Sequence, residues 1–117
     1  MVNWLDHIAV RLWPDLAIVD GRLPYFAVPN GGNRNAITGA IMKREGVRAG
    51  VPDLLIMVPS SRSHGLAIEM KKVKGSTTSK EQKAWGVALR KMGYHWEVCK
   101  GHEQAIDSIT KYLQGGM

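Results

Sequence analysis

The spacing of hydrophobic residues along the chain predicts eight secondary-structure elements, four of them helices. Apolar side chains three and four positions apart indicate a first helix over residues 3–12, which Pro14 ends, and a second over residues 35–45. A third helix opens at the capping-box sequence Ser79-Lys80-Glu81-Gln82, and a fourth spans residues 102–113. The residues that we expect the last two helices to bury are Trp85, Ala88, Leu89 and Met92, and then Ala105, Ile106, Ile109 and Leu113.

The other four elements are shorter and are predicted to be strands. They span residues 23–28, 53–58, 64–71 and 94–99. The second strand is continuously apolar after its first residue, which is typical of a strand buried on both faces, whereas the third alternates. These two should form an antiparallel hairpin, and the helix between the third and fourth strands should connect a parallel pair. The fold class that follows is α/β, with a mixed central sheet flanked by helices.

Composition narrows the class of protein. The chain has 117 residues, enough for one domain that we expect to span residues 1–117. With 44% hydrophobic and 22% charged residues, it is not predicted to be disordered or fibrous. The lone cysteine, Cys99, excludes an internal disulfide, and no apolar run is long enough for a membrane span. We therefore expect a cytoplasmic protein that does not associate with a membrane.

The net charge is less ordinary than the rest of the composition. Sixteen lysines and arginines against ten aspartates and glutamates leave a formal charge of +6. A small basic domain favours a polyanionic partner, and nucleic acid is the commonest one. The charge by itself does not separate an enzyme from a binding protein.

Two carboxylates and a lysine are predicted to converge. Asp53 begins the buried strand, and Glu69 and Lys71 share one face of the next strand in the hairpin. Since hairpin neighbours lie about 5 Å apart, the two carboxylates could hold one magnesium ion together with backbone carbonyls and water. The ammonium group of Lys71 could then orient an attacking water or offset charge on a phosphate. The competing interpretation places Glu69 and Lys71 on an exposed edge strand as solvated charges.

The same Glu-x-Lys pattern occurs once more, in the third predicted helix. There Glu81 and Lys83 are two positions apart on a helix and so face different directions. The residue between them, Gln82, has two interpretations. As the third residue of a capping box it would reach back to the amide of Ser79, and it could also contribute to the site. Both roles can hold at once.

Several motifs follow one another in an order that resembles a known family. They are Pro-Asn-Gly-Gly around Asn30, the block Gly46-Val47-Arg48-Ala49-Gly50-Val51-Pro52-Asp53, Ile68-Glu69-Met70-Lys71, Ser79-Lys80-Glu81-Gln82 followed by Trp85, and Gly93-Tyr94. In these motifs the chain resembles the VRR-NUC (virus-type replication-repair nuclease) branch of the PD-(D/E)xK nucleases, over roughly residues 24–113. A domain of this length is similar to the stand-alone phage and bacterial members, which resemble Holliday-junction resolvases.

The resemblance implies a restriction-endonuclease-like fold and a metal-dependent endonuclease that hydrolyses DNA. By the family motif, Asp53 and Glu69 would bind Mg²⁺ or Mn²⁺, helped by the backbone carbonyl of Met70. Lys71 would be the catalytic lysine, and Gln82 would be the family's helical glutamine near the metal site. Hydrolysis by an in-line water would leave a 5′-phosphate and a 3′-hydroxyl.

One part of the family pattern is absent from this chain. Members usually carry a glutamate on the first helix that completes the metal site, and no glutamate precedes Glu45 here. Asp6 is the nearest acidic substitute, whereas Asn3 is the alternative at the aligned position, so the number of bound metal ions stays open. No phosphate-binding glycine loop and no Ser-His-Asp arrangement is present, and we expect no small-molecule cofactor.

Basic and amide side chains surround the proposed site in the sequence. Their grouping fits a track for a phosphodiester backbone, although turn formation explains the asparagine equally well. The candidate DNA-binding residues are Asn30, Arg34, Lys43, Arg44, Arg48, Lys72, Lys74, Lys80 and Lys83. We expect a homodimer that acts on branched DNA, since a four-way junction is nearly two-fold symmetric. The alternatives are an inactive DNA-binding module on the same fold, and a nuclease for linear DNA or RNA.

Overall fold

The structure is a computed structural model, and it describes residues 24–28, 44, 46 and 48–115. The elements formed by these residues are β1 (Tyr25–Ala27), β2 (Leu54–Ile56), β3 (Leu66–Lys71), α3 (Lys80–Lys91), β4 (His95–Lys100) and α4 (His102–Leu113). Neither of these two helices is long and apolar enough to cross a membrane. The predicted helices over residues 3–12 and 35–45 lie outside the described residues, apart from Arg44, and so do Asn3, Asp6, Asn30, Arg34 and Lys43.

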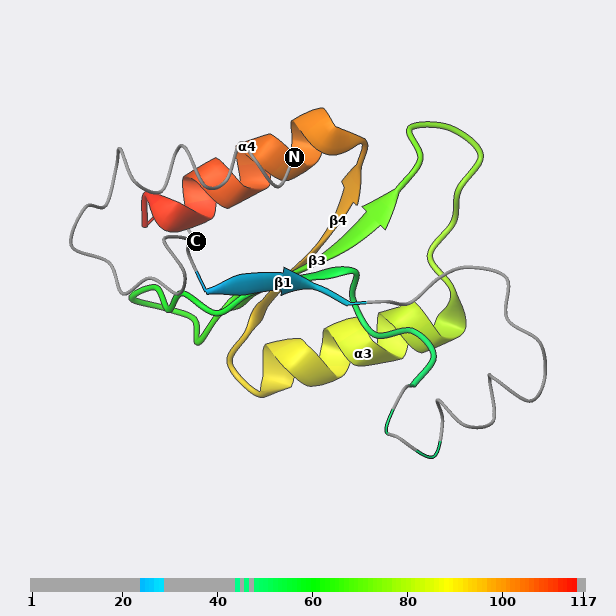
Figure 1. Cartoon of the computed structure of the whole chain (residues 1–117), viewed down its shortest axis with the longest axis horizontal. Coiled ribbons are helices and arrows are strands. Elements are labelled where there is room, and N and C mark those ends of the chain that lie inside the picture. The colour runs from blue at the N-terminus through cyan, green and yellow to red at the C-terminus, as the bar shows by residue number, and fades with distance from the viewer. Residues whose placement is uncertain (1–23, 29–43, 45, 47, 116–117) are drawn as a thin grey trace.

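The four strands form one mixed sheet in the order β1-β2-β3-β4 (Figure 1). β2 pairs antiparallel with both β1 and β3, and β4 joins β3 in parallel. The predicted hairpin, the parallel pair joined by a helix and the α/β class are therefore confirmed. β2 is shorter than predicted: the residues paired in register with both neighbours are Leu54–Ile56.

Helices α3 and α4 cover opposite faces of the sheet (Figure 1). The main core forms with α4, and it consists of Leu54, Ile56, Val58, Leu66, Ile68, Cys99, Ala105, Ile109, Tyr112 and Leu113. Three of the four α4 residues expected in the core are buried, but Ile106 is only half-buried. Tyr112 is buried as well, and its hydroxyl donates to the carbonyl of Val58 at 2.6 Å. This bond ties the last turn of α4 to the end of the hairpin strand.

The face of α3 that meets the sheet differs from the predicted one. Ala88 and Met92 are exposed, and Trp85 and Leu89 are half-buried; the residue of α3 that is fully buried is Gly86. The reason is a close approach between α3 and β4: a Cβ atom at Gly86 would lie 2.5 Å from the ring of Trp96. That contact rotates the buried stripe of the helix away from the Ala88 side.

A tight turn closes the β2–β3 hairpin. The amide of Ser60 donates to the carbonyl of Ser63 at 2.8 Å, and the hydroxyl of Ser60 accepts from the amides of Arg62 and Ser63. The turn lies beyond the Ile56–Leu66 pair, which is the end of the hairpin away from Asp53. The Asp53 end of the hairpin is where the polar site described next is found.

Candidate active site

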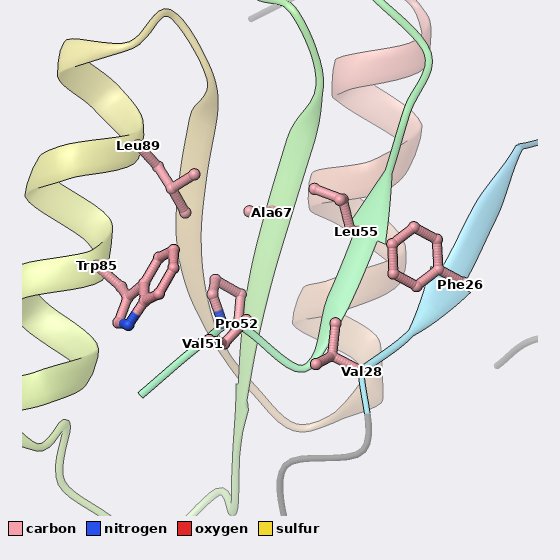
Figure 2. A pocket seen from close by; sticks show the side chains of 8 residues that line it. All are labelled: Phe26, Val28, Val51, Pro52, Leu55, Ala67, Trp85 and Leu89. Atoms are coloured by element: carbon pink, nitrogen blue, oxygen red, sulfur yellow. The ribbon is translucent and has the colours of Figure 1, made fainter. Parts of the chain in front are cut away.

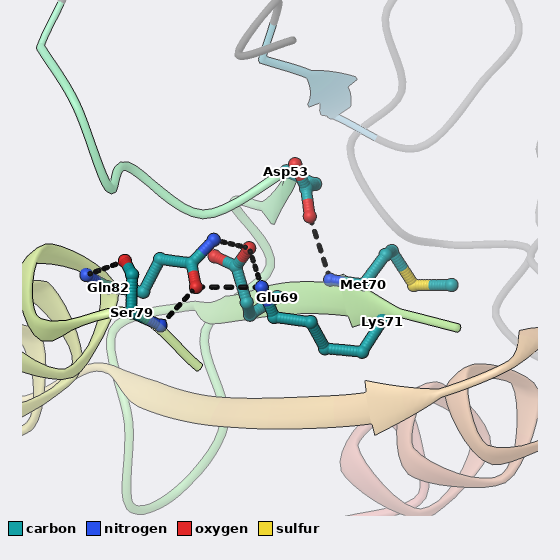
Figure 3. A network of polar contacts seen from close by, with 6 residues as sticks. All are labelled: Asp53, Glu69, Met70, Lys71, Ser79 and Gln82. Atoms are coloured by element: carbon teal, nitrogen blue, oxygen red, sulfur yellow. Dashed lines mark hydrogen bonds and ion pairs between the residues drawn. The ribbon is translucent and has the colours of Figure 1, made fainter. Parts of the chain in front are cut away.

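Backbone hydrogen bonds from two strands fix the position of Asp53. Its amide donates to the carbonyl of Ile68 at 3.0 Å, and its carbonyl accepts from the amide of Val28 at 2.8 Å. The side chain continues the pairing, because Oδ2 accepts from the amide of Met70 at 2.8 Å (Figure 3). Extending the register of the Leu54–Ile68 pair by one residue brings Asp53 opposite Glu69. The predicted convergence of these two residues is therefore present in the fold.

Glu69 is buried, with 2% of its surface exposed, on a strand that has neighbours on both sides. Its Oε1 atom accepts from the side-chain amide of Gln82 at 2.7 Å, whereas its Oε2 atom is buried without a hydrogen-bond partner. Burial, and secondly the neighbouring Asp53, raise the pKa of Glu69 from 4.5 to about 7, against an opposing effect of Lys71. The interpretation of an exposed edge strand is thus wrong for this residue, since β3 lies inside the sheet.

Gln82 joins the capping box of α3 to the charged residues of β3 (Figure 3). The backbone amide of Gln82 donates to the hydroxyl of Ser79 at 3.1 Å, and the side-chain Oε1 atom of Gln82 accepts from the backbone amide of Ser79 at 2.8 Å. The same Oε1 atom accepts from the ammonium group of Lys71 at 2.7 Å. The Nζ atom of Lys71 lies 3.8 Å from the Oε1 atom of Glu69. The capping contact and the contact with the charged residues therefore occur together.

The loop that leads to Asp53 is held against α3. The indole of Trp85 donates to the carbonyl of Ala49 at 3.1 Å, and the guanidinium of Arg48 lies 4.9 Å from the centre of the Trp85 ring. Gly50 has a φ of +87°, and a Cβ atom there would lie 2.6 Å from the backbone of Glu81. Sequence reasoning assigned Trp85 to the core and missed this contact. The only signal was its spacing from Gln82 on the same helix.

An apolar cavity borders the site on the α3 face of the sheet (Figure 2). Its volume is about 290 Å³, and its lining residues are Phe26, Val28, Val51, Pro52, Leu55, Ala67, Trp85 and Leu89. Pro52 directly precedes Asp53, and Ala67 shares a face of β3 with Glu69. The side chains that line this cavity offer no ligand for a metal ion. Pro52 therefore marks the boundary between the apolar cavity and the polar site that begins at Asp53.

Six of the predicted DNA-binding residues are described by the structure, and all six are exposed. They are Arg44, Arg48, Lys72, Lys74, Lys80 and Lys83. Lys72 and Lys74 follow Lys71 directly, on the connection from β3 to α3, and Lys80 and Lys83 lie on the first turn of α3. These four lysines thus come from the same end of β3 and the same end of α3 as Lys71 and Gln82, whereas Arg44 and Arg48 precede β2.

The donor atoms fit a hard divalent cation. Two carboxylates from neighbouring strands face each other, and one of their oxygen atoms, Glu69 Oε2, is buried and unpaired. Oxygen ligands of this kind suit Mg²⁺ or Mn²⁺. Within the described residues, no group of three or more His, Cys, Asp or Glu side chains could hold a metal ion. Any third protein ligand from this part of the chain would have to be a backbone carbonyl, such as that of Met70.

Comparisons with known proteins agree with this fold. The family model for the VRR-NUC domain matches residues 28–103. A solved structure described as a VRR_NUC domain protein shares 32% sequence identity with the chain at a TM-score of 0.70, covering 99% of this chain and 91% of its own. No curated protein sequence matches. The fold expected from the sequence is confirmed, and the chain belongs to the VRR-NUC domain family of PD-(D/E)xK-type nucleases.

Proposed function

We propose that this chain is a metal-dependent endonuclease for DNA, with residues 1–117 forming one nuclease domain. The observation that carries the proposal is the buried carboxylate of Glu69, opposite Asp53 and with an unpaired Oε2 atom. Burying a charged oxygen without a partner is unfavourable, and two adjacent carboxylates repel each other. A divalent cation bound between them would remove both costs.

The proposed catalytic residues are Asp53, Glu69, Lys71 and Gln82. When bound, Mg²⁺ or Mn²⁺ would supply Lewis-acid stabilisation of the phosphate and a more acidic water. Asp53 and Glu69 would hold the ion together with the carbonyl of Met70. One N–H of Lys71 donates to Gln82, and its remaining N–H groups would orient the attacking water or stabilise negative charge on the phosphate.

The reaction is an in-line displacement at phosphorus. The oxygen of water forms a bond to phosphorus while the bond from phosphorus to the 3′ oxygen breaks. The products are a 5′-phosphate and a 3′-hydroxyl: the attacking water releases a proton to solvent, and the leaving 3′ oxygen takes up a proton from solvent. The chain's contribution is to hold the water and the phosphate in line beside Lys71.

Exposed cations next to the site would bind the DNA backbone. Lys72, Lys74, Lys80 and Lys83 are exposed after the end of β3 and on the first turn of α3, and Arg48 is exposed beside the ring of Trp85. Arg44 is exposed as well, and Asn30, Arg34 and Lys43 complete the proposed set. Binding through phosphate contacts of this kind should weaken steeply as salt concentration rises.

We further propose branched DNA as the substrate and a homodimer as the working unit. A four-way junction has paired scissile phosphates, and two sites related by a two-fold axis would match them. Light scattering of the free protein and of its junction complex would measure the number of chains. A monomer that cleaves linear duplex as fast as a junction would contradict both parts of this proposal.

A cleavage assay tests the catalytic assignment. Wild-type protein is incubated with labelled junction, flap and linear DNA in the presence of Mg²⁺, Mn²⁺ or EDTA. Glu69→Gln should reduce the cleavage rate by at least about 100-fold, because it removes a metal ligand. Glu81→Gln is the matched control, since Glu81 belongs to the other Glu-x-Lys pattern and is exposed on α3. Equal rates for wild type and Glu69→Gln would refute the assignment.

A second candidate function is a DNA-binding module without turnover. The observation in its favour is that the described residues contain two site carboxylates and no cluster of three metal-binding side chains. This candidate predicts salt-sensitive binding to DNA and no product with either metal. The same assay separates the two functions, because wild-type protein either releases a 5′-phosphate end or only shifts the DNA in a gel.

A further inference from the structure

We propose that Ser79 is a positioning residue of the metal site and acts through Gln82, an inference that rests on the proposed function above. Ser79 is the N-cap of α3 and is itself exposed. Its amide donates to Gln82 Oε1 at 2.8 Å, and its hydroxyl accepts from the backbone amide of Gln82 at 3.1 Å. These two bonds fix both ends of the glutamine.

The orientation of the Gln82 side-chain amide follows from its neighbours. One of its two terminal atoms lies 2.8 Å from the amide of Ser79 and 2.7 Å from the ammonium group of Lys71. Both neighbours are donors only, so this atom must be the oxygen. The nitrogen is then directed at Glu69, whose Oε1 atom it reaches at 2.7 Å. A flipped amide would place its NH₂ group against two donors, Ser79 and Lys71, and its oxygen against the acceptor oxygen of Glu69.

This orientation determines which oxygen of Glu69 is available for a cation. Oε1 accepts from Gln82, and Oε2 is left buried and unpaired (Figure 3). Gln82 also holds Lys71 at 3.8 Å from Glu69, whereas a direct charge-assisted hydrogen bond would measure about 2.8 Å. The amide therefore keeps the lysine beyond direct hydrogen-bonding distance of the carboxylate, and Ser79 keeps the amide in place.

Two substitutions of Ser79 test whether the capping hydroxyl is the group that matters, because one removes it and the other keeps it. Ser79→Ala removes the acceptor for the Gln82 amide, so the first turn of α3 loosens and the glutamine loses one of its anchors. Ser79→Thr keeps a hydroxyl that can cap in the same way. If Ser79 positions the site, the alanine variant should be impaired and the threonine variant should recover the wild-type behaviour.

The control must lower stability without touching the site. Tyr112→Phe does this, because it removes the buried hydrogen bond to the carbonyl of Val58 in the core on the α4 side of the sheet. Any loss of function that follows only from reduced stability should appear in Tyr112→Phe as well as in Ser79→Ala.

The first measurement is the affinity for Mn²⁺ without DNA, by calorimetry on folded protein. Ser79→Ala should bind Mn²⁺ about 10-fold more weakly than wild type, which is typical when a residue that orients a metal ligand is lost. Ser79→Thr and Tyr112→Phe should bind like wild type. The second measurement is the nitrogen–proton NMR signal of the Gln82 side-chain amide in metal-free protein, which should shift and exchange faster in Ser79→Ala alone.

The outcomes distinguish this inference from the proposed function. Wild-type protein that neither binds Mn²⁺ nor cleaves DNA would refute the proposed function, and this inference with it. Wild-type protein that does both, with a Ser79→Ala variant that matches Tyr112→Phe in Mn²⁺ affinity and in the Gln82 signal, would refute the role of Ser79 alone. Failure of Ser79→Thr to recover Mn²⁺ affinity would also overturn it.

Discussion

Replacing Glu69 by glutamine preserves the shape of the side chain and removes its charge. The pKa of this carboxyl group rises from 4.5 to about 7 on folding, because of burial first and Asp53 second. The folded protein therefore binds this proton more tightly than the unfolded chain does, so the associated stability is complete below pH 4.5 and is lost as the pH rises through 7. At about 1.4 kcal/mol for each pKa unit, the ionised carboxylate lowers the free energy of unfolding by about 3 kcal/mol at pH 8.

The Glu69→Gln variant should thus be more stable than wild type when no metal is present. We expect a gain of up to about 3 kcal/mol at pH 8 in EDTA, which corresponds to a rise in Tm of roughly 10 °C for a chain of this size. At pH 4 the two proteins should unfold alike. Urea and thermal unfolding followed by circular dichroism, from pH 4 to pH 8, measure the difference, with Glu81→Gln as the exposed control.

Two results would refute this reasoning. One is a Glu69→Gln variant that is no more stable than wild type at pH 8, and the other is a gain of equal size at pH 4. Adding Mn²⁺ supplies an independent check at pH 8, since a ligand at 100 times its Kd stabilises the folded protein by about 2.7 kcal/mol. Wild type should gain this stability and the variant should not, so the difference of about 3 kcal/mol between the two proteins should nearly disappear.

Three further predictions concern the surroundings of the site. Gly50→Ala should lower the free energy of unfolding by about 2–4 kcal/mol in urea denaturation, because of its positive φ and the close approach to Glu81; an unchanged midpoint would contradict this. Trp85→Phe should cost about 1 kcal/mol, from the lost bond to Ala49, and should lower kcat in the cleavage assay by loosening the loop that leads to Asp53; equal kcat would show that the loop does not depend on that bond. A double replacement of Lys72 and Lys74 by alanine should reduce the slope of log Kd against log salt, measured by fluorescence anisotropy, by about 0.9 for each lost phosphate contact. The exposed Lys111 of α4 is the control for that experiment, and its replacement should leave the slope unchanged.

Much of the fold could be predicted from the hydrophobic pattern. Period-two alternation in residues 64–71 placed Glu69 and Lys71 on one face, and the short hairpin brought that face beside Asp53. The buried face of α3 could not be predicted in the same way, because it depends on how closely the helix approaches β4. The contact between Gly86 and Trp96 sets that distance, and it joins residues on two different elements.

The candidate site could likewise be predicted only in part. The identity of its charged residues follows from the order of motifs, but the burial of Glu69 follows from the order of strands, which places β3 between β2 and β4. The double contact of Gln82 depends on side-chain hydrogen bonds that join α3 and its N-cap residue to β3. A helical pattern indicates a capping box, and only the packed structure shows that Gln82, the third helical residue of that box, also reaches Glu69.

The tight turn between β2 and β3 makes this protein a suitable host for engineering. Ser61 and Arg62 are exposed at its tip, at the end of the hairpin that lies away from Asp53 and Glu69. Exposed turns of this type tolerate inserted sequence well. A targeting module or a fluorescent reporter grafted between these two residues would leave the paired strands intact, so cleavage and localisation could be modified separately.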